Sequence, residues 1–174
     1  MLENILNFEK EKNATPDTYI VPSEHLLSVL DNLKRKGYDF LDCITAVDLK
    51  NIKGKEDKIA VVYNLSSSCD GTKKIAIKVF LPRDNPIIQS ICSLYPTAEW
   101  HEREEYDLVG VIFEGHPSLK RIMLPEDWEG HPLRKDYKQP ESWHGIDNRY
   151  FAEGSNPQRY AKDILRDFWE EEQN

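Results

Sequence analysis

The chain has 174 residues, of which 39% are hydrophobic and 31% charged, a balance that excludes a disordered chain and permits a domain with its own core. A formal net charge of -8 disfavours nucleic acid as the main partner, because phosphate binding requires a basic surface. Three cysteines at wide spacing, with no C-x-x-C pair, favour a reducing compartment over a disulfide framework or a thiolate-held cluster.

The first predicted elements are a short strand and an amphipathic helix. Residues 18–21 have strand character and end at Pro22. Ser23 is a suitable helix N-cap, and the basic run at residues 34–36 suits a last helical turn before Gly37. Four leucines at helical spacing would form the buried face of this helix: Leu26, Leu27, Leu30 and Leu33.

Three strands follow at residues 38–47, 59–65 and 74–81. Polar loops link them, and an Asp70-Gly71 turn precedes the third. Successive strands with hairpin-like links predict an antiparallel or mixed sheet.

Two further helices are predicted beyond the sheet. Asn85-Pro86 would begin one that contains Ile87, Ile88, Ile91 and Leu94. Thr97 would cap another that includes residues 100–108, and short extended segments would follow at 109–113 and 119–124. We therefore expect an α+β core domain over residues 1–124, a two-layer mixed or antiparallel sheet with helices packed on one face.

Residues 125–174 differ in composition from the predicted core. Aliphatic residues become sparse, prolines interrupt regular structure, and aromatic residues recur from Trp128 to Trp169. We predict an extended aromatic- and proline-rich C-terminal arm that ends in a short helix carrying Tyr160, Ile164 and Phe168 on one stripe. Such aromatics would pack on the core or on another protein.

The densest polar stretch lies on the Thr97 helix. Glu99, Arg103 and Asp107 stand at i,i+4 spacing and would form ion pairs. Glu104 shares a stripe with Trp100 and Leu108, which predicts a buried carboxylate whose partner would be an arginine, Arg121 or Arg134. A general acid would look similar, but structural ion networks are the more common cause of such a pattern.

No sequence motif predicts catalysis. His101, Glu104, His116 and His131 could be imagined as metal ligands, but the zincin spacing is absent, and His116 and His131 each lie between glycine and proline, as in turns. No glycine-rich phosphate loop and no G-x-S-x-G elbow is present. No catalytic, cofactor-binding or metal-binding residue is predicted, and a binding or assembly role is favoured.

The order of residues from Glu102 to Tyr137 closely resembles the signature of the C-type subunit of NADH-quinone oxidoreductase, the thirty-kilodalton subunit family of respiratory complex I. The matching stretches are Glu102-Arg103-Glu104-x-Tyr106-Asp107-Leu108-Val109-Gly110, Phe113-x-Gly115-His116-Pro117-x-Leu119-x-Arg121-Ile122 and Leu124-Pro125-x-Asp127-Trp128-x-Gly130-His131-Pro132-Leu133-Arg134-Lys135-Asp136-Tyr137. The strand at residues 44–48 also looks like this family.

The resemblance implies a non-catalytic structural subunit of the peripheral arm of a proton-translocating NADH dehydrogenase. It implies a location on the cytoplasmic side of the inner membrane, with no membrane span. It also implies contact with neighbouring peripheral-arm subunits, above all the D-type subunit, which helps to form the quinone site. The protein would bind no cofactor of its own, whereas the complex would use NADH, FMN, iron–sulfur clusters and quinone in electron transport.

The resemblance also suggests residue roles. A structural ion network would comprise Glu102, Arg103, Glu104, Asp107 and Arg121. A partner interface would comprise Asp127, Trp128, His131, Arg134, Lys135, Asp136 and Tyr137. Two alternatives remain open: the equivalent subunit of a membrane-bound nickel–iron hydrogenase or deazaflavin-linked dehydrogenase, and an independent metal- or carboxylate-dependent enzyme.

Overall fold

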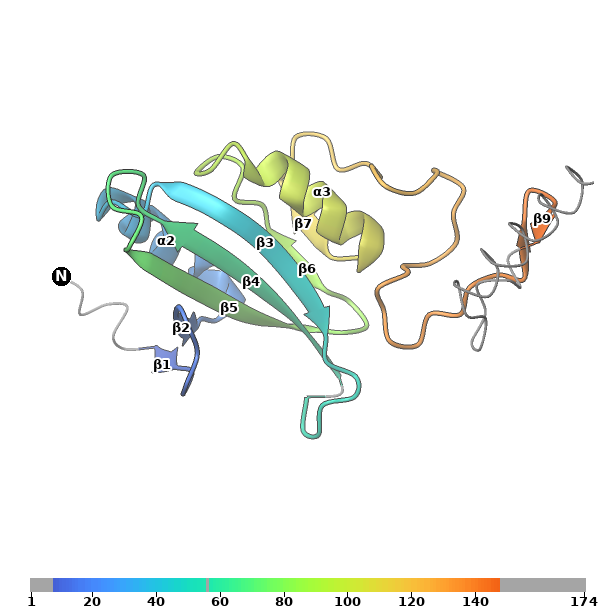
Figure 1. The fold of residues 1–174 in the computed structure, drawn as a ribbon, viewed down its shortest axis with the longest axis horizontal. Helices are drawn as coiled ribbons and strands as arrows, with labels where there is room; N and C mark the ends of the chain where they lie inside the picture. The colour runs from blue at the N-terminus through green and yellow to red at the C-terminus, as the bar shows by residue number, and fades with distance from the viewer. Residues whose placement is uncertain (1–7, 56, 148–174) are drawn as a thin grey trace, which may run out of the picture. The chain divides into compact units, whose positions relative to one another are not determined.

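The computed structural model describes residues 8–55 and 57–147 (Figure 1). The chain divides into two compact units, Met1–Tyr137 and Lys138–Asn174. The first unit therefore includes residues 125–137, which the sequence prediction assigned to the arm. None of the helices in the described ranges has the length and apolar character needed to cross a membrane.

A mixed sheet forms the centre of the first unit, as predicted, and it has five strands. The strand order is β1-β2-β5-β4-β3, in which β2 runs parallel to β5 and the other neighbours are antiparallel. The bounds are Glu9–Lys10 (β1), Asp17–Ile20 (β2), Phe40–Asp48 (β3), Lys58–Ser66 (β4) and Lys74–Pro82 (β5). Burial alternates along β3, where Ile44 and Ala46 are buried and Thr45 and Val47 exposed, so the helices cover one face of the sheet.

Helix α2 (Leu26–Arg35) packs its leucines into this core, as predicted. Its start differs from the prediction, because a 3₁₀ turn, Ser23–His25, precedes it and no side chain caps it. Its end is as expected: Lys34 and Arg35 lie in the last turn, and Gly37 has a φ of +91°, which a residue with a Cβ rarely adopts.

The helix predicted at Asn85-Pro86 is wrong. Ile87–Gln89 is a strand, β6, which pairs in parallel with β7 (Ile112–Glu114). The Ser90 N–H extends this pairing by donating to the Glu114 carbonyl at 2.8 Å. A short apolar run is compatible with either a helix or a strand in sequence. Here isoleucine, which is β-branched and favours extended backbone, pairs with the neighbouring strand β7.

Helix α3 (Ala98–Leu108) forms where it was predicted and packs on β3, the edge strand of the sheet (Figure 1). The extended segment predicted at 109–113 overlaps β7 at Ile112 and Phe113, whereas the one predicted at 119–124 is not a strand. In the second unit, β8 (Ser142–Trp143) and β9 (Ile146–Asp147) form a small hairpin. The helix predicted around Tyr160 lies outside the described residues.

Candidate functional site

The buried face of α3 differs from the predicted one. Trp100 is 62% exposed and Glu104 is half-buried, whereas the helix buries Ala98, Glu102, Glu105 and Asp107. The prediction that Glu104 lies on a buried stripe with Trp100 is therefore wrong. Periodicity assigns carboxylates to the solvent side, but a carboxylate can be buried where backbone N–H groups are available to it.

Asp107 binds the chain that returns along the C-terminal end of α3. We call residues 121–137 the return segment. The Oδ2 atom of Asp107 accepts the backbone N–H groups of Ile122, Met123 and Leu124 at 3.0, 2.7 and 2.9 Å. Its Oδ1 atom accepts a 2.7 Å hydrogen bond from Arg121. These N–H groups bind a carboxylate instead of a neighbouring strand, which explains why residues 119–124 do not form one.

These bonds keep Asp107 ionised. Burial is the largest influence and opposes ionisation, but the backbone amides and Arg121 together hold the pKa of Asp107 below its ordinary value. The predicted partnership of Arg121 with a buried carboxylate of this helix is present, although the carboxylate is Asp107 rather than Glu104.

The return segment continues along the end of α3. Leu133 N–H donates to the Leu108 carbonyl at 3.0 Å, and the Arg134 Nε–H donates to the Val109 carbonyl at 2.7 Å. The imidazole of His131 lies against Gly110, where a Cβ would stand 2.5 Å from the ring. Gly110 also has a φ of +81°, so this close approach requires glycine on both counts.

Asp48, the last residue of β3, holds the far end of the return segment. Its carboxylate accepts two hydrogen bonds from Arg83, at 2.9 and 3.0 Å, and one from the backbone N–H of Lys135 at 2.9 Å. Burial opposes ionisation, but these donors hold the pKa of Asp48 below its ordinary value. Arg83 also pairs with Asp136, whose pKa falls to about 2 because of hydrogen bonds from Arg83 and Lys50.

The remaining predicted site residues lie as follows. Arg103 donates to the carbonyls of Lys120 and Arg121 and stands 5.1 Å from the Trp100 ring, rather than pairing at i,i+4 spacing. Trp128 Nε1–H donates to the Tyr137 hydroxyl at 3.0 Å, and Asp127 is exposed. Most residues predicted to contact a partner thus also hold this chain's own return segment. Sequence reasoning missed Arg83, for which no motif gave a signal.

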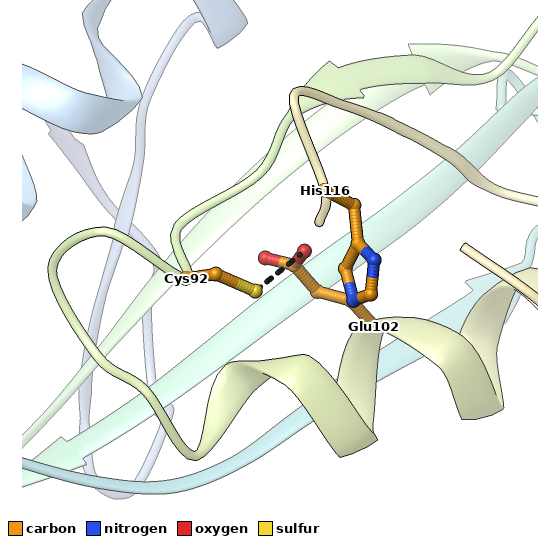
Figure 2. A group of neighbouring side chains, drawn as sticks. All are labelled: Cys92, Glu102 and His116. Atoms are coloured by element: carbon orange, nitrogen blue, oxygen red, sulfur yellow. Dashed lines mark hydrogen bonds between the residues drawn. The ribbon is translucent and has the colours of Figure 1, made fainter. Parts of the chain in front are cut away.

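A third polar cluster lies beside the middle of α3. Figure 2 shows Cys92, Glu102 and His116, which come from the turn after β6, from α3 and from the turn after β7. Their ligand atoms all lie within 4.8 Å of one another. Glu102 accepts the Ile91 N–H at 2.7 Å and the Cys92 thiol at 3.5 Å. His101 and His131, which the sequence analysis considered with His116 as metal ligands, are not in this group.

The donor set does not fit a resident metal ion. The Nδ1 atom of His116 accepts the Ser118 N–H at 3.0 Å, so the ring proton is on Nε2, which donates to the Glu99 carbonyl at 3.1 Å. Neither nitrogen has a lone pair available. Burial is the main cause that raises the pKa of Cys92 to about 11, which opposes the thiolate that a metal requires. The cluster instead fastens the turn after β6 to α3.

Fold and site together define a class of protein: a small α+β domain whose buried carboxylates bind its own backbone and its own returning chain. Residues 19–142 match the family described as respiratory-chain NADH dehydrogenase, 30 Kd subunit. The chain belongs to this family, as the sequence resemblance implied.

Two curated relatives that agree with this assignment are C-type subunits of NADH-quinone oxidoreductase. The chain is 42% identical over 95 residues to the protein of Chloroherpeton thalassium, covering 55% of this chain and 38% of that protein. It is 45% identical over 123 residues to the protein of Moorella thermoacetica, covering 70% and 80% of the two chains.

Two solved structures have the same fold. A trypsin-resistant fragment of Nqo5, residues 1–134, superposes with a TM-score of 0.60 at 29% identity, over 68% of this chain and 98% of that one. A chain of the membrane-bound sulfane sulfur reductase, an archaeal respiratory membrane complex, superposes with a TM-score of 0.66 at 28% identity, over 79% and 81%.

Proposed function

We propose that this chain is a non-catalytic structural subunit of the peripheral arm of a proton-pumping NADH-quinone oxidoreductase. It docks against the D-type subunit, near the quinone-reducing module, on the cytoplasmic side of the inner membrane. NADH, FMN, the iron–sulfur clusters and quinone are bound by other subunits of that complex. Family membership supports the assignment to the complex, and the geometry of α3 supports the docking role.

The observation that carries the docking role is the exposure of large apolar side chains on α3 and the return segment. Trp100 is 62% exposed, Met123 64% and Leu133 56%. The polar groups beside them, such as Asp107 and Arg121, are already engaged within the chain. Apolar anchors surrounded by internally bound polar groups are typical of a protein interface, where aromatic residues contribute most of the binding energy.

The buried carboxylates support a non-catalytic role. Asp48, Glu102 and Asp107 each accept backbone N–H groups of this chain, so their oxygens hold structure instead of facing a substrate. A general acid or base must lie within hydrogen-bond reach of the proton that it transfers.

The test is co-purification of the tagged full-length chain with the D-type subunit from gently solubilised membranes. Trp100→Ala is expected to lower the recovery of that partner at least about tenfold, as for an aromatic interface anchor. Ile52→Ala is the matched control, because Ile52 is 49% exposed but lies in the loop after β3. Equal recovery of the D-type subunit with both folded variants contradicts docking through Trp100.

Arg134→Ala tests the contribution of the return segment. It removes the hydrogen bond to the Val109 carbonyl and is expected to reduce assembly while circular dichroism shows a folded domain. A folded, fully assembled and active mutant complex argues against the assignment of Arg134 to docking.

A second candidate is the equivalent position in another membrane-bound respiratory complex. The observation in its favour is the likeness to a chain of the archaeal sulfane sulfur reductase complex. The partners identified by mass spectrometry separate the two: NADH-oxidising subunits support the first candidate, and a hydrogenase-like large subunit without them supports the second.

A further inference from the structure

Glu105 is a buried residue of α3, the helix that packs on β3. The residue is 7% exposed and its side chain points at the strand on the edge of the sheet. Since β3 has a neighbouring strand on one side only, an N–H group on its other side needs a different acceptor. The Ala46 N–H donates to the Glu105 carboxyl group, which thus takes the place of a missing strand.

The second oxygen of this carboxyl group has no partner. Within the described residues, Glu105 Oε2 is one of two buried side-chain oxygen or nitrogen atoms without a hydrogen bond. An ionised carboxylate would bury a charge with this oxygen unsatisfied, whereas a protonated carboxyl group is neutral and costs less free energy to bury.

No lysine, arginine or histidine among the described residues forms an ion pair with Glu105, and the charged group that influences it is the acidic Glu104. The other buried carboxylates at this face, Asp48 and Asp107, pair with Arg83 and Arg121. Neither β3 nor β7, the strands that α3 contacts, contains a lysine, arginine or histidine. The ionisable residues that these strands contribute are Asp42, Cys43 and Asp48 on β3 and Glu114 on β7. On α3 itself, the buried Glu102 and the half-buried His101 and Glu104 are neighbours of Glu105. Arg134 of the return segment is bound to the Val109 carbonyl.

We propose that Glu105 is a proton-binding site, whose neutral carboxyl group fastens α3 to the edge of the sheet and whose ionisation weakens that contact. Burial is the largest cause that raises the pKa of Glu105 to about 7; Glu104 raises it further, and the Ala46 amide opposes the shift.

The sign of the effect follows from the two states. The unfolded chain loses this proton near 4.5, the ordinary value, and the folded chain near 7. Between these values only the folded state holds the proton, so the contribution to stability falls as pH rises through this window and is constant above it. The Glu105 carbonyl also accepts the N–H groups of Val109 and Gly110, at 3.1 and 3.0 Å, so a weakened contact extends to the end of α3.

The experiment compares the full-length chain with Glu105→Gln, which is neutral at every pH and keeps the acceptor for Ala46. Above pH 7 the variant is expected to have a folded-to-unfolded ratio higher than the parent by on the order of 100-fold, since each pKa unit is tenfold. Below pH 4.5, the ordinary value for glutamate, the two should agree within a few-fold. Glu114→Gln is the control, because that side chain is exposed on β7, and it should match the parent at every pH.

A direct titration of the Glu105 side-chain carboxyl carbon by NMR in the parent chain keeps the test independent of the variant's folding. A midpoint near 7 supports the proposal. A midpoint at the ordinary glutamate value overturns it, as does a stability difference between parent and variant that is the same at every pH.

Discussion

The C-terminal end of α3 and the turns before it bury carboxylates in different ways. At the C-terminal end, Asp107 has an arginine and several backbone amides, and Asp48 nearby has the same combination. In the preceding turns of the helix, Glu102 and Glu105 are buried with no lysine or arginine partner in the described ranges. The pKa values of Asp48 and Asp107 are lowered and those of Glu102 and Glu105 raised, so burial alone does not decide the charge of a carboxylate.

The largest expected effect is at the arginine-paired end. Asp107→Ala leaves Arg121 and the amides of residues 122–124 without their acceptor and should cost about 3–5 kcal/mol of unfolding free energy, as for a broken buried ion pair. Urea denaturation measures it. An exposed acidic residue of the return segment, Glu126, provides the control: Glu126→Ala should change the unfolding free energy by less than about 0.5 kcal/mol. A similar loss of unfolding free energy for Asp107→Ala and Glu126→Ala would contradict a special role of the buried carboxylate.

The pH dependence of stability sharpens the comparison, because the two kinds of carboxylate act with opposite sign. Asp48 and Asp107 have folded pKa values below 3.8, so their stabilisation is complete above that value and is lost as pH falls through the folded pKa. Glu105 contributes in the other direction between 4.5 and about 7, by up to about 3 kcal/mol. Denaturation midpoints should therefore pass through a maximum near the ordinary glutamate value. The fall in the denaturation midpoint above this pH should disappear in Glu105→Gln. A midpoint that rises steadily to neutral pH in the parent would contradict the opposite signs expected for Glu105 and the two aspartates.

Two glycines with the same backbone conformation test the close approach of the return segment. Gly110→Ala should cost about 2–4 kcal/mol, because it combines a φ of +81° with a Cβ placed 2.5 Å from the His131 ring. Gly115→Ala has the same φ and open space around the new Cβ, so it should cost only about 1 kcal/mol. Thermal unfolding of both variants gives the difference, and equal losses would show that His131 moves aside freely.

The smallest effect is expected in the rates at which the cysteines react with a thiol reagent. The half-buried Cys92 thiol has its pKa raised to about 11 and donates to Glu102, so it should react with a thiol reagent on the order of 100-fold more slowly than an ordinary exposed thiol. Cys69 is exposed and provides the comparison within the same molecule. Mass spectrometry after timed alkylation measures both rates, and rapid labelling of Cys92 in the folded chain would contradict the geometry of the cluster.

The sheet was predictable because each of its long strands carries a local signal. Alternating apolar residues and turn residues identified β3, β4 and β5, and the residues that end α2 identified its C-terminus. The strand β6 was not predictable, because Ile87 and Ile88 suit either helix or strand until β7 is beside them. The buried face of α3 was not predictable either, since hydrophobicity patterns do not register that Ala46 and Ile91 offer N–H groups to carboxylates.

The candidate site was predictable as a set of residues and not as a set of contacts. The family motif identified Asp107, Arg121 and the residues from Asp127 to Tyr137, but it did not distinguish bonds within the chain from bonds to a partner. That distinction depends on how the return segment folds against α3 and Asp48. The exposed Trp100, Met123 and Leu133 were not among the predicted interface residues, because exposure is a property of packing rather than of sequence.

The placement of α3 on β3 has a consequence for the free protein before assembly. An open edge strand is a template for pairing with another chain and therefore a common origin of aggregation. Here the Glu105 carboxyl group occupies an amide of that edge, and the Asp48 side chain at its end holds the backbone of Lys135. The Ala46 amide of this edge is thus not open to pairing with a second copy of the free chain.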